Sequence, residues 1–233
     1  MLWDVDYTLL AADGSGRDLY QAALDELYGL ELSGPLTSFA GRTDSAIALE
    51  ILTLAGVPDP QQQMRPFQAF VAGRADQLAA DVRIRGRAMP GAAQALAAMV
   101  AARPPGEIIQ SLLTGNLPEL AWAKLTALEL TEHLDLTIGA YGDVSAVRAD
   151  LVAVARRNAA ARHGGEFTGR DTILVGDTPD DIGAALATGA SAVGVATGSF
   201  SARQLTDAGA HLVLPDLADT DAVVAAILGA SGA

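Results

Sequence analysis

The sequence predicts an α/β protein with a mostly parallel sheet covered by helices on both faces, and with an all-helical cap inserted after the first strand. From about residue 90 onward, short apolar runs alternate with segments of helical periodicity, as in β-α-β units. Residues 11–87 show helical patterns alone. Successive predicted strands end in Thr, Asp or Gly. Residues 1–10 and 88–233 are therefore assigned to the core, and residues 11–87 to the cap.

Composition excludes several functional classes. The chain has 233 residues, of which half are apolar, enough for a sizeable core. Its net charge of −13 repels phosphate backbones and anionic membranes, so neither nucleic acid nor membrane is expected as a partner. Because there is no cysteine, disulfides, thiolate nucleophiles and zinc–thiolate sites are excluded together.

The start of the chain gives two expectations. No positively charged start leads into an apolar signal segment, and no run of about 18 apolar residues occurs, so a cytoplasmic protein is expected. Only three residues precede Asp4, whereas a buried strand usually has about 5–6, which leaves an upstream start open. Both a monomer and a homodimer are compatible with the sequence.

Three helices are predicted in the cap. The first covers residues 17–28, where apolar positions follow helical spacing. The second begins after Thr43, a favourable N-cap, with Asp44 in its first turn. The third is expected from Gln61 to Ala80. A helical block of this length between two parts of a sheet predicts a separate small lobe.

The rest of the chain alternates helices and strands. Strands are expected over residues 108–113, 134–138, 172–175, 192–196 and 211–214. Helices are expected over residues 90–102, 147–162, 182–187, 202–208 and 218–228, and one more from Pro118. Right-handed connections would bring the carboxyl ends of the strands to one edge of the sheet, where open α/β sheets bind ligands.

The first strand end carries the pattern on which the functional prediction depends. Asp4, Asp6 and Thr8 alternate behind a short apolar lead-in. In an extended strand, side chains at positions i and i+2 point the same way. Crowded carboxylates repel each other and favour a shared proton or a divalent, oxygen-preferring metal. Alone, the pattern is also an ordinary turn signal, since Asp readily bonds its own backbone.

Later strand ends add complementary groups. Thr114-Gly115-Asn116 follows the second core strand, Arg148 opens a later helix, and residues 176–181 read Gly-Asp-Thr-Pro-Asp-Asp. Together these residues offer a nucleophile, a proton donor, metal ligands and donors for phosphoryl oxygens, the set that displacement at phosphorus needs. Separately, Asp177, Gly115 and Asn116 are also good turn and cap residues.

With these motifs in this order, the chain resembles the haloacid dehalogenase superfamily of phosphohydrolases, and in particular its phosphoglycolate phosphatase and β-phosphoglucomutase-like members with a helical cap. The resemblance covers nearly the whole length, including the cap between the first and second motifs. It implies a Rossmann-like, three-layer α/β/α core. It also implies magnesium-dependent hydrolysis of a small phosphate ester through an aspartyl-phosphate.

The resemblance assigns roles residue by residue. Asp4 would be the nucleophile, and Asp6 would protonate the leaving alcohol and then activate water. Thr114 would hold a phosphate oxygen beside the Gly115 amide. Thr8, Asn116 and Arg42 are further candidates for contact with phosphate or substrate. Magnesium would bind Asp4, the Asp6 carbonyl and Asp177, with Asp181 binding directly or through water.

Three positions depart from the family pattern. Tyr7 stands where the family usually has Gly, which puts the turn after the nucleophile in doubt. The third motif is usually a lysine, but the only lysine here, Lys124, lies well inside the helix after Thr114. Arg148 is therefore preferred as the phosphate-site cation, since arginine keeps its charge and binds oxygen pairs. Asp180 adjoins Asp181, so either could serve the metal.

Arg42, between two cap helices, points either into the cleft toward an anionic substrate or into solvent. Phosphomutase activity is an alternative to hydrolysis. Dehalogenation is disfavoured because the family's dehalogenases lack the second aspartate, here Asp6. The remaining alternative is a family member that binds phosphate without catalysis, because Tyr7 replaces the usual glycine beside the nucleophile.

Overall fold

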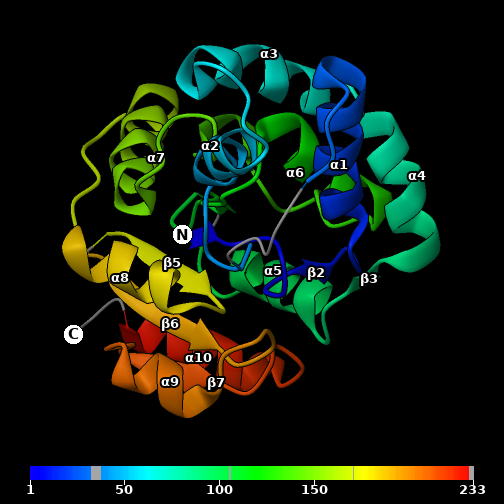
Figure 1. Ribbon diagram of the computed structural model, residues 1–233. Helices are drawn as coiled ribbons and strands as arrows, with labels where there is room; N and C mark the ends of the chain where they lie inside the picture. Colours follow the sequence, from blue (N-terminus) through cyan, green and yellow to red (C-terminus); the bar gives the residue numbers. More distant parts are fainter. Residues whose placement is uncertain (33–37, 105, 170, 231–233) are drawn as a thin grey trace.

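The core of the protein is a five-stranded parallel sheet with strand order β4-β1-β5-β6-β7 (Figure 1). The computed structural model describes residues 1–32, 38–104, 106–169 and 171–230. The strands are β1 (Leu2–Trp3), β4 (Ser111–Leu112), β5 (Ile173–Gly176), β6 (Ser191–Val195) and β7 (Leu212–Leu214). Trp3 pairs with Leu112 on one side and Val175 on the other, so the first strand is central.

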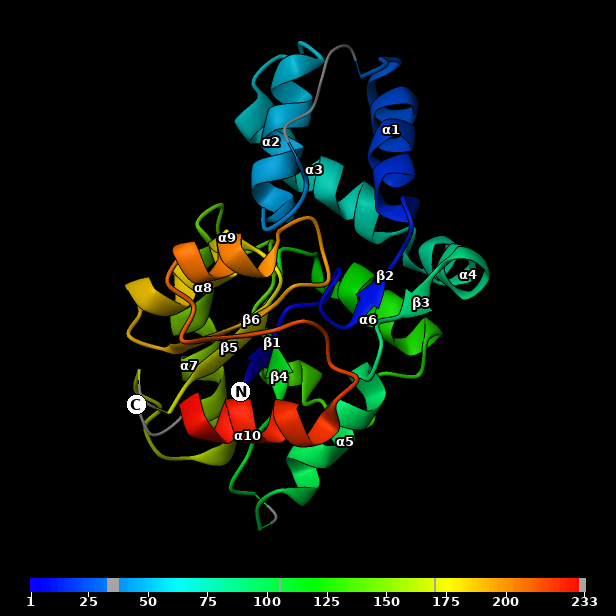
Figure 2. The same ribbon diagram turned by 90° about the horizontal axis from the view of Figure 1, so that it is seen from below.

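Helices cover both faces of this sheet (Figure 2). On one face lie α5 (Ala92–Ala101) and α10 (Thr220–Ala230); on the other lie α8 (Pro179–Ala187) and α9 (Ala202–Asp207), with α7 (Arg148–His163) packed on α8. The predicted fold class is confirmed. Among the described helices, none is both long and apolar enough to cross a membrane.

The strand predicted over residues 134–138 is wrong. Leu136–Ile138 form a 3-10 turn, η1. The Asp135 carboxylate accepts hydrogen bonds from the Thr137 amide and hydroxyl, at 3.0 and 2.6 Å, which stabilises a turn in place of an extended chain. Pairing at this edge of the sheet is reduced to one parallel bridge, between Leu113 and Ala140.

Within residues 11–32 and 38–87, the inserted segment forms a lobe of four helices: α1 (Ser15–Tyr28), α2 (Asp44–Leu54), α3 (Pro60–Ala72) and α4 (Ala75–Arg85). The predicted N-cap is confirmed, since the Thr43 hydroxyl accepts a hydrogen bond from the Ala46 amide at 3.3 Å. The single helix predicted from Gln61 to Ala80 is wrong. It breaks after Ala72, at Gly73, because glycine disfavours a helix interior.

Two short strands join the lobe to the core. β2 (Leu10–Ala11) and β3 (Arg87–Ala88) pair antiparallel, Leu10 with Ala88 and Ala11 with Arg87. The prediction of helices alone in residues 11–87 is therefore wrong at both ends of the segment. Strands of two residues are too short to show an alternating pattern in the sequence.

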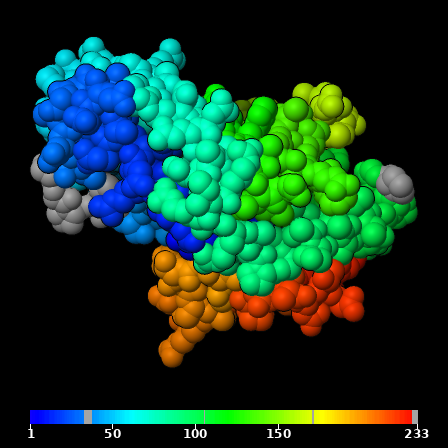
Figure 3. All heavy atoms as spheres, turned by 90° about the vertical axis from the view of Figure 1, so that its right-hand side faces the viewer, coloured from blue at the N-terminus to red at the C-terminus, as the bar shows by residue number. Residues whose placement is uncertain are grey.

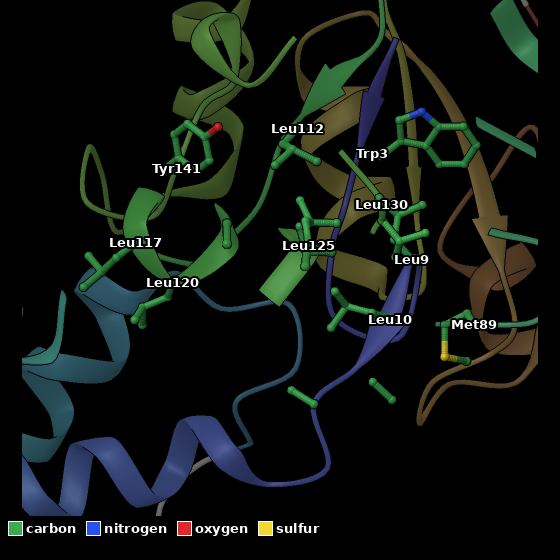
Figure 4. Close-up of a cluster of buried hydrophobic side chains, with 14 of the residues drawn as sticks. Trp3, Leu9, Leu10, Met89, Leu112, Leu117, Leu120, Leu125, Leu130 and Tyr141 are labelled. Atoms are coloured by element: carbon green, nitrogen blue, oxygen red, sulfur yellow. The ribbon is translucent and has the colours of Figure 1, made fainter. Parts of the chain in front are cut away.

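One buried hydrophobic cluster runs from the sheet into the lobe. Figure 4 shows its sheet and linker part, where Trp3, Leu9 and Leu10 lie close to Met89 and to α6 (Pro118–Ala127) residues such as Leu125. In the lobe the cluster continues through Leu24, Ile51 and Phe67. The space-filling view shows the lobe, in blue and cyan, in contact with the green part of the core (Figure 3). The lobe is therefore packed onto the core and is more than a tethered domain.

Candidate active site

The predicted site residues, apart from Thr8 and Asp181, line a cavity of about 320 Å³ between the core and the lobe. From the core, the cavity is lined by side chains at the carboxyl ends of β1, β4 and β5, and from the lobe by α1, α2 and the segment between them. The residues used below are Asp4, Asp6, Tyr20, Arg42, Asp44, Thr114, Asn116, Lys124, Arg148 and Asp177. The sheet edge expected from the sequence is thus the edge that faces the lobe.

Three carboxylates form a buried group, here called the three-aspartate cluster. Asp4, Asp177 and Asp181 each offer an oxygen, and these oxygens lie within 4.8 Å of one another. Their relative exposures are 7%, 1% and 2%. The backbone at Gly198 approaches so closely that an added Cβ would lie 1.8 Å from Asp177 Oδ2, so a side chain there would displace this carboxylate.

Arg148 is the cation of this cluster. Its Nη2 donates to Asp4 Oδ1 and Asp181 Oδ1, both at 2.6 Å. The other Asp181 oxygen accepts from the Thr178 amide at 3.1 Å and hydroxyl at 2.7 Å. The neighbouring Asp180 is exposed. Of the two adjacent aspartates, Asp181 is therefore the one that joins the cluster.

The cluster carries more negative than positive charge. Burial, followed by repulsion from Asp4 and Asp181, raises the pKa of Asp177. Burial also raises the pKa of Asp4, although Arg148 opposes this. Burial disfavours the charged form of Arg148, but Asp181 and Asp4 outweigh it and raise its pKa. Because one guanidinium faces three carboxylates, and because all the donors are oxygens, the site fits a hard divalent cation such as magnesium.

A second group, here called the Asp6–Lys124 group, lies beside the first. Lys124 Nζ donates to both Asp6 oxygens at 2.8 Å and to Asn116 Oδ1 at 2.6 Å. Asn116 Nδ2 donates to Asp6 Oδ2 at 2.7 Å and to Thr114 Oγ1 at 2.8 Å. Lys124, which the sequence places a turn or more from the expected phosphate position, lines the same cavity and contacts Asp6. Lys124 shares the buried face of α6 with Leu120, Ala121 and Leu125, and a lysine on an apolar stripe was the available sequence signal.

Two predicted substrate contacts have protein partners. Thr8 is fully buried, and its hydroxyl lies 3.5 Å from Asp177 Oδ1, so it contacts a carboxylate of the three-aspartate cluster. Arg42 lines the cavity, but its guanidinium is paired with Glu50 and donates to the Ala46 carbonyl at 3.3 Å.

Tyr7 adopts a turn conformation at the position where the family usually has glycine. Its φ is 61°, in the left-handed region that disfavours residues with a Cβ. The Tyr7 amide donates to the Leu10 carbonyl at 2.6 Å, and the Thr197 hydroxyl donates to the Tyr7 carbonyl. The side chain itself is 40% exposed. The departure from the family pattern thus leaves Asp4 and Asp6 in place at the expense of local strain.

The start of α2 docks directly on the core, a contact that the sequence did not reveal. The Asp44 amide donates to the Gly115 carbonyl at 2.6 Å, and the Ser45 amide to the Gly142 carbonyl at 3.1 Å. In return, Asp44 Oδ2 accepts from the Leu117 amide at 2.7 Å. A Cβ at Gly115 would lie 1.9 Å from the Arg42 carbonyl oxygen, so this contact requires glycine.

Asp44 is a buried acid, and within the described part of the chain no ion pair joins it to a cation. Burial raises its pKa to about 6, against the neighbouring Tyr20 hydroxyl and the hydrogen bond from the Leu117 amide, which favour the charged form. It is 7% exposed. The sequence predicted Asp44 only as a first-turn residue of α2. In the structure it also links the lobe to the loop that carries Thr114.

A larger cavity of about 690 Å³ lies elsewhere, at the amino ends of the strands. Met1, Ile109 and Arg156 are among its lining residues, and the Met1 amino group donates to the Ile109 carbonyl at 2.7 Å. It contains none of the predicted site residues. Selection by size alone would therefore pick a cavity that lacks all of these residues.

Comparison with known proteins agrees with the fold and with part of the sequence. Residues 148–220, from the start of α7 to the first residue of α10, match the family described as HAD-hydrolase-like. Among curated proteins, none matches the chain. The predicted resemblance to the haloacid dehalogenase superfamily is confirmed by this match together with the fold.

Solved structures match the chain over nearly its whole length. A hydrolase from Pseudomonas syringae is 20% identical, with a TM-score of 0.66 and 97% of each chain covered. A predicted phosphatase from Clostridium acetobutylicum is 17% identical, with a TM-score of 0.68, covering 98% of this chain and 97% of that one. CbbY from Rhodobacter sphaeroides, in complex with phosphate, is 17% identical, with a TM-score of 0.67 and 94% of each chain covered. At these identities the similarity establishes the fold.

Proposed function

We propose that this chain is a magnesium-dependent phosphatase that hydrolyses a small phosphorylated metabolite through an aspartyl-phosphate on Asp4. The observation that carries the proposal is the buried grouping of Asp4, Asp177 and Asp181 around Arg148, with Asp6 beside it. The match of residues 148–220 to HAD-like hydrolases supports the same reaction class. Two structural neighbours agree with it, one a predicted phosphatase and the other a structure in complex with phosphate.

The reaction would proceed in two steps. First, an Asp4 oxygen attacks phosphorus, the bond from phosphorus to the leaving oxygen breaks, and that oxygen takes a proton from Asp6. Then water attacks the phosphorus of the aspartyl-phosphate and gives a proton to Asp6, and the Asp4 oxygen leaves. Inorganic phosphate is released, and both aspartates return to their starting states.

The remaining site residues would hold the phosphoryl group. Thr114 and the Gly115 amide would bind its oxygens, and Arg148 would orient Asp4. Magnesium, held by Asp4, Asp177 and the Asp6 carbonyl, with Asp181 direct or through water, would reduce the repulsion between the nucleophile and the phosphate anion.

The lobe would limit the substrate to a small molecule. A cavity of about 320 Å³ is at the lower end of the range for sites that bind small ligands. The contacts of Asp44 and Ser45 with the core keep the lobe over the site, which would exclude water during transfer to Asp4. The partner proposed for this chain is therefore a small phosphate ester.

The test is phosphate release from p-nitrophenyl phosphate and a panel of metabolite phosphates, with magnesium and with EDTA. We expect turnover that needs magnesium and that is abolished in Asp4→Asn. Asp180→Asn is the matched control, because this exposed aspartate adjoins the site but lies outside the three-aspartate cluster. It should retain wild-type turnover, whereas Asp181→Asn should not.

Two results would contradict the proposal. One is phosphate release that persists in folded Asp4→Asn, because the nucleophile would then be another group. The other is phosphate transfer from the substrate to a second sugar with no release to water, which would identify a mutase.

A further inference from the structure

Lys124 has an environment that is unusual for a lysine. It is the only lysine in the chain, and it is 5% exposed, although lysines almost always keep the amine in water. Removing an ammonium group from water costs free energy unless charged and polar partners replace the water. A helix residue that is buried at this cost needs a reason beyond packing.

The partners of the amine supply that reason. An ammonium group has three donors, and Lys124 directs them at the two oxygens of Asp6 and at Asn116 Oδ1. The contact with Oδ1 also fixes the orientation of the Asn116 amide. As a result, Asn116 Nδ2 faces Asp6 Oδ2 and Thr114 Oγ1. One side chain therefore fixes both the Asp6 carboxylate and the amide that connects it to Thr114.

We propose that Lys124 is a positioning residue for Asp6, and that it acts in proton transfer to the leaving group without binding the phosphate. This inference rests on the proposed function, in which Asp6 gives its proton to the leaving oxygen as the bond to phosphorus breaks. Lys124 and Asn116 would then hold the resulting carboxylate in place until water returns a proton to it. The phosphate side of the site has its own cation, Arg148, on Asp4 and Asp181.

The test uses leaving groups that differ in their need for a proton. p-Nitrophenolate leaves without protonation, whereas an alkyl alcohol needs a proton from Asp6. Lys124→Met removes the charge and keeps a side chain of similar volume. In this variant we expect kcat/KM for an alkyl phosphate to fall roughly 10²-fold or more. We expect kcat/KM for p-nitrophenyl phosphate to fall less than about 10-fold. In an Asp6→Asn background, Lys124→Met should add little.

Chemical restoration of the amine at position 124 would distinguish loss of the positioning role from loss of the fold. Because the chain has no cysteine, Lys124→Cys can be alkylated at this position alone. Treatment with 2-bromoethylamine rebuilds a lysine-like amine and should restore the alkyl-to-aryl ratio of rates, whereas iodoacetamide, which adds a neutral amide, should not. Arg74→Met is the control for loss of a half-buried cation elsewhere, since Arg74 pairs with Glu26 in the lobe.

A readout without turnover distinguishes failure of this inference from failure of the proposed function. With magnesium present, inorganic phosphate should raise the melting temperature of wild type and of folded Lys124→Met alike. Loss of that shift in Lys124→Met would identify Lys124 as a phosphate ligand and overturn the inference, as would equal losses of kcat/KM on aryl and alkyl esters. If wild type neither turns over any ester nor responds to phosphate, the proposed function fails and this inference fails with it.

Discussion

The two charged groups of the site hold their aspartates in different ways. In the three-aspartate cluster, three buried carboxylates share one guanidinium, and burial raises the pKa of Asp4 and Asp177. In the Asp6–Lys124 group, one carboxylate, with its side chain 34% exposed, faces one ammonium and one amide. The second group is balanced by the chain itself. The first carries an excess of negative charge, so the proposed magnesium ion would belong to this side of the site and not to the other.

The largest expected effect compares the two cations directly. Arg148→Met leaves the three buried carboxylates without the cation that binds Asp4 and Asp181, and should lower the free energy of unfolding by about 3 kcal/mol or more. Lys124→Met should lower it by only about 1 kcal/mol, because Asp6 keeps Asn116 and is screened by water. Urea unfolding at neutral pH without magnesium measures both losses. Equal losses would mean that the two groups do not differ in the way described.

The next effect concerns the added cation. Magnesium at about 100 times its dissociation constant should stabilise the wild-type protein by about 2.7 kcal/mol, since it binds only the folded cluster. Lys124→Met should keep this gain, and Asp177→Asn should lose it. Thermal unfolding with magnesium and with EDTA gives the comparison. A gain that depends on Lys124 would place the ion on the wrong side of the site.

Asp44 adds a third way of holding a buried carboxylate, with a backbone amide as its nearest partner. Its folded-state pKa of about 6 lies above the roughly 3.9 of an unfolded chain, so the folded state binds the proton more tightly. The contribution of Asp44 to stability therefore falls as pH rises from about 4 to about 6, and the loss persists at neutral pH.

Asp44→Asn keeps a carbonyl oxygen for the Leu117 amide and cannot titrate. Relative to wild type, we expect it to gain on the order of 2 kcal/mol between about pH 4 and pH 7. Urea unfolding of both proteins across this range, at constant magnesium, measures the difference. A difference that stays constant with pH would show that burial does not perturb Asp44.

The smallest effect is expected at Tyr7, the residue that follows Asp6. Glycine accepts a φ of 61° without strain, so Tyr7→Gly should stabilise the protein by about 0.5–1 kcal/mol, after the entropy that glycine loses on folding. Tyr7→Ala is the control, because it removes the ring and keeps the strain. Stabilisation of the two variants to the same degree would assign the effect to the exposed ring.

The sequence predicted the parts of the site that lie at strand ends. Asp4, Asp6, Thr114 and Asp177 follow apolar runs, and the parallel sheet brings such positions to one edge whatever the details of packing. Arg148 was predicted for the same reason, since it opens a helix that follows that edge. Fold class and site edge are thus properties of pattern and topology.

Contacts made across the fold could not be predicted in this way. Lys124 reaches Asp6 because of the rotation of α6, and Asp44 reaches Leu117 because of the way the lobe docks. Helical spacing places Lys124 on the buried face of α6, but it does not specify Asp6 as the partner, and no spacing specifies the partner of Asp44. The strand expected over residues 134–138 failed because Asp135 bonds its own turn, a local competition that apolar periodicity does not register.

The paired strands β2 and β3 bear on how such a protein can change over evolution. Because Leu10 pairs with Ala88 and Ala11 with Arg87, the chain leaves and re-enters the core at neighbouring points. Seen from the sheet, the whole lobe is the loop of a hairpin, and the entropy of closing a loop grows only slowly with its length. A lobe of another size could be exchanged at this ribbon while the path of the sheet stays the same. Substrate preference could then diverge by replacement of the lobe, with the proposed chemistry at Asp4 inherited unchanged.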